Sequence, residues 1–102
     1  MSQGDGSILQ DFNKVFSNRV RLGMMSVLMV EEWVEFKKLK ELLDVTDGNL
    51  ASHIAALEKL AYVEVRKQFV GKRPQTAYKT TAEGRVAFEA HLNALEQLLE
   101  GL

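Results

Sequence analysis

Two apolar stripes separated by a three-residue turn constrain the fold of this chain more than any other feature. The first stripe predicts a short helix over Phe36–Leu43, and the second predicts a helix over Asp47–Leu60. The apolar positions are Phe36, Leu39 and Leu43 in the first segment, and Leu50, Ile54, Leu57 and Ala61 in the second. Only the turn Asp44–Thr46 connects them, so both stripes are buried together only if the helices meet at a steep angle. The pattern indicates a helix-turn-helix.

A β-ribbon is predicted directly after the second helix. Tyr62–Phe69 alternates between apolar and polar residues, as in a half-buried strand, and Thr76–Thr80 supplies the returning strand. Gly71 and Pro74 suit the loop between them. Trp33–Val34 is expected to add a very short third strand to the same sheet.

Helices are also predicted before this unit. A short amphipathic helix is expected over Ile8–Phe16, and a longer one over Arg19–Val30 with Ser17 or Asn18 as its N-cap. In the second motif helix, Thr46 is the expected N-cap.

The final segment, Ala82–Leu102, is predicted to be a helix capped by Thr80 or Thr81. Its apolar residues form a seam with heptad-like spacing that is too short for a free coiled coil. We therefore expect a homodimer, assembled through Ile8–Phe16 and this final helix. The candidate dimerisation residues are Phe12, Phe16, Phe88, Leu92, Leu95 and Leu99.

Together the elements predict a mainly α fold with a small β-ribbon. It is a winged helix-turn-helix with a three-helix core, a two- to three-stranded antiparallel wing, and flanking N- and C-terminal helices. The 102 residues fit one domain, with a tail and short helix at 1–17, the winged unit at 18–81 and the dimerisation helix at 82–102. The chain has neither a membrane-length apolar run nor a secretory signal pattern, so we expect no membrane partner and a cytoplasmic location.

Charge is distributed unevenly along the chain. The net charge is −1, but residues 62–81 hold five basic residues against Glu64, a net +4. Residues 82–102 hold Arg85 against four glutamates, a net −3. This polarity favours a basic ribbon that attracts phosphate.

No residue set suggests catalysis or a cofactor. The chain lacks cysteine, and its two histidines, His53 and His91, do not have the spacing of metal ligands. Ser52 and His53 are neighbours that point about 100° apart on a helix, so they do not form a nucleophile–base pair. We expect a protein that is not an enzyme and has no cofactor.

Polar residues in the first turns of the second motif helix are suited to read DNA. Asn49 can bond adenine, Ser52 a base or phosphate, and His53 guanine or phosphate. With an ordinary pKa of about 6.5, His53 is expected to strengthen DNA binding as the pH falls towards 6. Lys37, Lys38 and Lys40 of the first motif helix are interpreted as a solvated face. The candidate DNA-binding residues are Thr46, Asn49, Ser52, His53, Arg66, Lys67, Lys72, Arg73 and Gln75.

These segments resemble the MarR/ArsR-type bacterial winged-helix transcriptional regulators, and most closely their short members. The matching segments are Asn18–Leu22, Phe36–Leu43, Val45–Glu58, Tyr62–Val63, Arg66–Lys67 and Thr80–Arg85. The resemblance implies a sequence-specific DNA-binding regulator with its recognition helix in the major groove of double-stranded DNA. One departure is Ala61, which stands where the family usually has glycine at the end of the recognition helix.

The alternative function is a winged helix that binds another protein instead of DNA. Such a protein would need an uncharged wing and an apolar helix face, whereas Asn49, Lys72 and Arg73 are polar or basic. A small-molecule effector is compatible with the sequence, but no residue pattern supports one.

Overall fold

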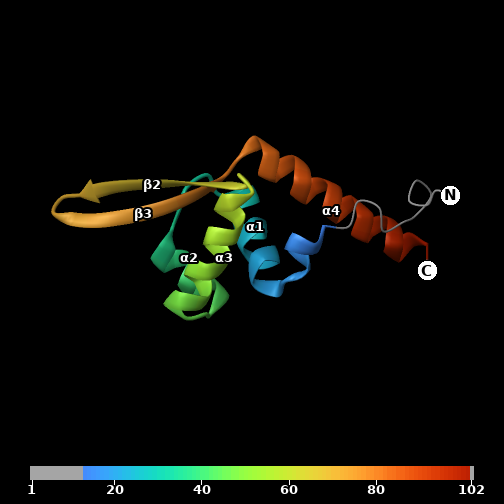
Figure 1. Cartoon of the computed structure of the whole chain (residues 1–102), viewed down its shortest axis with the longest axis horizontal. Helices are drawn as coiled ribbons and strands as arrows, with labels where there is room; N and C mark the ends of the chain where they lie inside the picture. Colours follow the sequence, from blue (N-terminus) through green and yellow to red (C-terminus); the bar gives the residue numbers. More distant parts are fainter. Residues whose placement is uncertain (1–12, 102) are drawn as a thin grey trace.

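The computed structural model describes residues 13–101, in which four α-helices carry a three-stranded sheet (Figure 1). The elements are η1 (Lys14–Ser17, a 3-10 turn), α1 (Arg19–Val30), β1 (Val34–Glu35), α2 (Phe36–Leu43), α3 (Asp47–Lys59), β2 (Val63–Val70), β3 (Arg73–Thr80) and α4 (Ala82–Glu100). The predicted winged-helix fold is confirmed. None of the helices within residues 13–101 combines the length and apolar character needed to cross a membrane.

Side-chain caps start three of the helices where the sequence predicted. Asn18 accepts from the backbone N–H groups of Val20 and Arg21, and Thr46 accepts from that of Asn49. Thr81 likewise accepts from the N–H of Gly84 at the start of α4. Each cap satisfies a first-turn donor that has no partner inside its own helix.

The sheet has the order β1-β3-β2 and is antiparallel throughout. β1 pairs only with Ala77 and Tyr78, so β2 and β3 continue beyond it as a two-stranded wing that projects from the helices (Figure 1). The wing is longer than predicted, because β3 begins at Arg73 instead of Thr76. The connecting turn is only Gly71–Lys72, and Gly71 has a φ of 66°, which primed hairpin turns require.

Pro74 lies inside β3, opposite Phe69, and not in the loop where the sequence placed it. A proline has no N–H to donate, so it is tolerated near the start of a strand or along an unpaired edge. β1 ends before reaching this part of β3, which leaves such an edge.

The core between the helices consists of side chains that are almost fully buried. It includes Met24, Met25, Leu28, Leu39, Leu50, Ile54, Leu57 and Phe88. The helix-turn-helix stripes supply Leu39, Leu50 and Leu57, so their burial is confirmed, whereas Ala61 is exposed beyond the end of α3 and its predicted burial is wrong. Met24 and Met25 of α1 are both fully buried in this core.

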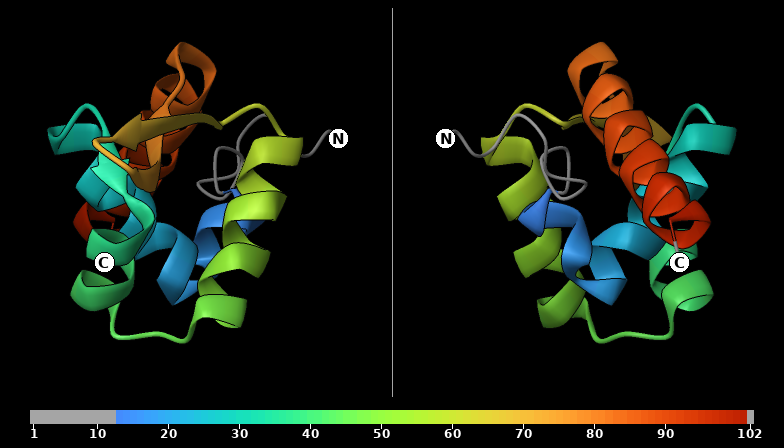
Figure 2. Two further views of the ribbon diagram at one scale, coloured as in Figure 1. Left: turned by 90° about the vertical axis from the view of Figure 1, so that its left-hand side faces the viewer. Right: turned by 90° about the vertical axis from the view of Figure 1, so that its right-hand side faces the viewer.

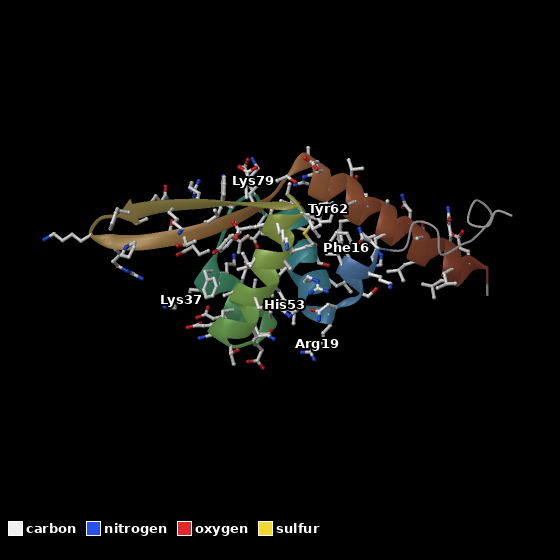
Figure 3. All side chains as sticks on the ribbon, in the orientation of Figure 1. Phe16, Arg19, Lys37, His53, Tyr62 and Lys79 are labelled. Carbon is white, nitrogen blue, oxygen red and sulfur yellow. The ribbon has the colours of Figure 1, made fainter. Side chains whose placement is uncertain are left out.

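Phe16 connects η1 to α4 and to the end of α3. Its ring lies 5.1 Å from that of Phe88 and 5.6 Å from those of Tyr62 and His91. Figure 3 labels Phe16 and Tyr62. Both phenylalanines are 1% exposed, so direct dimer contacts by Phe16 and Phe88 are a wrong prediction. Periodicity shows that one face of a helix is apolar, but it does not show whether the same chain or a partner covers that face.

The segment before α1 also differs from the prediction. Lys14–Ser17 forms a single 3-10 turn and not the end of an α-helix. The rest of the predicted helix, Ile8–Phe12, lies outside the described residues, and with it the candidate dimer residue Phe12.

The end of α3 is a left-handed cap formed by an alanine. Ala61 has a φ of 62°; its N–H donates to Glu58 at 2.9 Å, and the N–H of Tyr62 donates to Leu57 at 2.9 Å. This pair of bonds is the Schellman motif, which normally uses glycine because a Cβ is disfavoured at positive φ. Ala61 is the position at which the resembled family usually has glycine.

Replacing Ala61 with glycine should stabilise the protein by about 1 kcal/mol, since the left-handed backbone no longer carries a Cβ. Urea unfolding followed by circular dichroism measures this change. Ala55→Gly, at an exposed position inside α3, is the matched control and should destabilise by about 1 kcal/mol. A less stable Ala61→Gly variant would show that the alanine cap is not strained.

Candidate nucleic-acid interface

The exposed face of α3 carries short side chains, and those of Asn49 and Ser52 are polar. Opposite buried Leu50, Ile54 and Leu57 lie the exposed residues Gly48, Asn49, Ala51, Ser52 and Ala55. A helix with short side chains lets its backbone come close to a binding partner, and Asn49 and Ser52 supply hydrogen-bonding groups. Such a helix is suited to a groove whose floor carries donors and acceptors.

His53 is held by a charged partner that the sequence did not suggest. Nη1 of Arg21, from α1, lies 3.0 Å from Nδ1 of His53, and Nε of Arg21 donates to the carbonyl of Val15 at 2.6 Å. A guanidinium only donates, so Nδ1 is the acceptor and the proton of the neutral ring is on Nε2. His53 is therefore prepared to donate a hydrogen bond through Nε2.

The same surroundings alter the titration of His53. Burial of the ring, followed by the positive charge of Arg21, lowers the pKa of His53 below its ordinary value of 6.5. The assumption that the pKa of His53 has its ordinary value was wrong, because it ignored the burial of the ring and a cation from another helix. Protonation is displaced to lower pH, and less positive charge develops near pH 6 than the sequence suggested.

A shallow hollow joins the start of α1 to the first half of α3. Its lining includes Asn18, Arg19, Thr46, Asn49 and His53. Figure 3 shows Arg19 and His53 in the lower part of the helical body, where the turn between α2 and α3 also lies. Arg19 is exposed and was missed by the sequence reasoning, which treated it only as the first residue of its helix. The hydroxyl oxygen of Thr46 already accepts a hydrogen bond from the backbone N–H of Asn49, at 3.1 Å.

The wing carries its free cations towards its tip. Lys67, Lys72 and Arg73 are exposed, and no carboxylate within residues 13–101 forms an ion pair with them. Lys72 lies in the two-residue turn, where its side chain is unobstructed. These three candidates are therefore available to an anionic partner.

Arg66 and Gln75 each have a side-chain partner within the chain. The guanidinium of Arg66 stacks over the Trp33 ring at 4.5 Å, and Gln75 accepts a bond from Gln68 at 2.9 Å. Lys79 lies over the same indole at 5.6 Å and pairs with Glu32 at 3.3 Å. The structure thus gives Arg66 and Gln75 roles in shaping the wing, which alternating strand positions alone do not distinguish from DNA contact.

Two of the three lysines of α2 form ion pairs. Lys38 pairs with Glu31 and Lys40 with Asp47, each at 2.9 Å. Lys37 has no such partner among the described residues and lines a hollow between α2 and the wing, together with Lys67 and Arg73. Figure 3 shows Lys37 on the α2 side of the ribbon, away from Lys79. The solvated-face interpretation therefore misses the position of Lys37 beside the cations of the wing.

The arrangement shows no centre for metal chemistry. Within the part of the chain that the structure describes, no three His, Asp or Glu side chains gather closely enough to hold an ion. What the residues do bring together is a polar helix face, a cationic wing and one more cation, Lys37, on α2. These groups all suit a phosphate-bearing partner with exposed base edges.

Comparison with known proteins agrees with this geometry. Residues 20–99 match the family described as winged helix DNA-binding domains. The chain belongs to this family. The predicted resemblance to the MarR-type regulators is confirmed, since members of that group share the fold of this winged-helix protein.

Proteins similar to this chain come from several organisms. An uncharacterized protein of Methanocaldococcus jannaschii is 38% identical over 89 residues, which are 87% of this chain and 97% of that protein. The structure of a transcriptional regulator homologue from Pyrococcus horikoshii OT3 is 32% identical, with a TM-score of 0.82 over 92% of this chain and 91% of the other. A MarR-family structure from Enterococcus faecalis V583 is 23% identical, with a TM-score of 0.72 over 92% and 80% of the two chains.

The pKa of His53 should lie below 6.5 in the free protein and rise when Arg21 is replaced by methionine, because the opposing charge is removed. Burial remains in the variant, so the rise should be partial. Nitrogen-15 NMR titration of the imidazole measures the pKa and also reports which ring nitrogen holds the proton. Arg19→Met is the matched control and should leave the His53 pKa unchanged.

Proposed function

We propose that this winged-helix protein is a sequence-specific transcriptional regulator that binds double-stranded DNA. The observation that supports this most strongly is the pairing of a small, polar α3 face with unpaired cations on the wing and on α2. The family membership and the regulator named in the Pyrococcus horikoshii structure agree with the proposal.

In this proposal, α3 lies in the major groove and Asn49, Ser52 and His53 contact base edges. The first turns of a recognition helix are the part that reaches the bases. Because Nε2 of His53 carries the proton, His53 reads an acceptor, such as N7 or O6 of guanine. Thr46 and Arg19 then lie near the phosphates that border the groove.

The wing is proposed to bind the adjacent backbone or minor groove. Its positive charge comes from Lys67, Lys72 and Arg73. Lys37 adds a cation at the hollow between α2 and the wing, where a DNA strand would pass. Phosphate contacts of this kind fix the position of a protein on DNA but carry little sequence information. Affinity therefore comes from the wing and specificity from α3.

A homodimer is the proposed binding unit. On α4, Leu92 is 42% and Leu99 is 69% exposed, while Leu95 is half-buried. Exposed leucines on one helix face favour self-association, which removes apolar surface from water. A two-fold dimer would present two α3 helices to two half-sites of a pseudo-palindromic operator.

The proposal is tested by selecting genomic fragments with the purified protein at two salt concentrations. Enrichment of one sequence motif that persists at the higher salt supports specific readout. Binding that disappears uniformly with salt would leave only electrostatic attraction. No DNA binding together with capture of a protein on α3 would favour the interaction-module alternative.

Asn49→Ala should weaken binding to the selected operator by about 1–3 kcal/mol and relax the preference at one base position. Non-specific affinity should change little, because phosphate contacts are retained. Titration by fluorescence anisotropy, with a repeated selection, measures both effects. Asn93→Ala, an equivalent change at an exposed position of α4, should have no effect. An unaltered operator preference in Asn49→Ala would show that this face of α3 does not read bases.

Leu92→Glu combined with Leu99→Glu should convert the dimer into a folded monomer, because each interface leucine becomes charged. Light scattering at micromolar concentration and circular dichroism report the two properties. Asn93→Glu with Gln97→Glu adds the same charge at exposed polar positions of α4 and should leave the dimer intact. A wild-type monomer at that concentration would contradict the proposed assembly.

A further inference from the structure

The tip of the wing carries apolar side chains where a charged ribbon has no evident need of them. Phe69 is 73% exposed and lies opposite Pro74, and Val70 is 54% exposed opposite Arg73. Large apolar groups on a projecting element indicate a surface that another molecule covers. The core does not need these residues, because the wing residues in the core cluster, Val63 and Tyr78, lie away from the tip, and Figure 1 shows the ribbon continuing beyond the helices.

The charges around the tip indicate what covers it. Between Val65 and Ala82 the sequence has five basic residues and no acidic one. Two such tips would repel each other, so a second copy of the ribbon is a poor partner. An anionic polymer that also offers flat apolar surfaces between stacked bases meets both requirements of this tip.

We propose that Phe69, supported by Pro74, is a wedge that enters the minor groove of bound DNA, separates two stacked base pairs and bends the duplex. This inference rests on the proposed DNA-binding function and adds an activity to it. Apolar side chains, phenylalanine and proline among them, kink DNA by about 20–90° when they insert between base steps in the minor groove.

The geometry of the ribbon suits insertion. The two-residue turn keeps the tip narrow, so the β2 and β3 residues next to it approach the DNA together. Phe69 and Pro74 are direct cross-strand partners on one face, and the proline ring adds a rigid second apolar group. Lys67 and Lys72 lie close to Phe69 along the chain, where they can contact the phosphates on either side of an opened step.

Strand alternation supplies a matched control. Val70 is next to Phe69 and is also exposed, but its side chain projects from the opposite face of the ribbon. Val70→Ala removes apolar surface from the tip without touching the proposed wedge. Phe69→Leu retains a smaller apolar wedge, whereas Phe69→Ala removes it.

The experiment uses the full chain with the DNA fragment it selects, labelled at both ends for energy transfer. A second set of probes has 2-aminopurine at successive steps flanking the α3 site, where fluorescence rises on unstacking. Wild type and Val70→Ala should bend the DNA and brighten one step. Phe69→Ala should bind with the same salt dependence but leave the DNA straight and the probe dark, and Phe69→Leu should restore part of both signals.

Several results separate this inference from the proposed function. Absence of DNA binding by the wild type would contradict the proposed function itself. Specific binding without bending or unstacking, or bending by Phe69→Ala equal to that of wild type, would overturn the wedge alone. Lys72→Ala with Arg73→Ala should instead lower the salt slope by about one to two units per subunit. Insertion of the tip into anionic phospholipid vesicles, with no change in bound DNA, would also overturn it.

Discussion

The carbonyl oxygen of Tyr62 is the point at which the end of α3, the wing and α4 are joined. It accepts from the N–H of Thr81 at 3.0 Å and from the hydroxyl of Thr80 at 3.1 Å. Gly84 makes this approach feasible, because a Cβ there would lie 2.2 Å from the same oxygen. The hydroxyl of Thr81 also donates to Ala61 at 2.6 Å. The strained end of α3 is thus bonded to the start of α4. From this junction the bodies of the two helices run apart, as Figure 2 shows.

Electrostatic pairing then determines which parts of the surface attract an anion. Ion pairs between exposed groups contribute little to stability, so their main effect here is on the distribution of charge. Glutamates of the β1 region engage Lys38 and Lys79, and Asp47 engages Lys40. Among the cations outside these pairs, Lys67 and Arg73 of the wing line one hollow together with Lys37, which gives a protein of net charge −1 a cationic side.

Local features were predictable because their causes are local. The bounds of α1 and α2 follow from apolar periodicity, and the caps at Asn18, Thr46 and Thr81 follow from side-chain oxygens placed before helices. The resemblance pointed to Ala61, because the family usually has glycine at this position, and the φ of Ala61 is positive. The length of the wing was not, because a proline and a glycine suggest a loop and Pro74 instead occupies an unpaired stretch of strand edge.

The sequence by itself determined the order of elements, the fold class and the location of the basic segment. These depend on residue spacing and on charges that are close along the chain. Only the tertiary structure decided which side chains remain available. Phe16 and Phe88 are covered by each other, Arg66 by Trp33, and His53 is bonded to Arg21. Each of these partners lies at least 30 residues away, where periodicity carries no information and only packing brings the groups together.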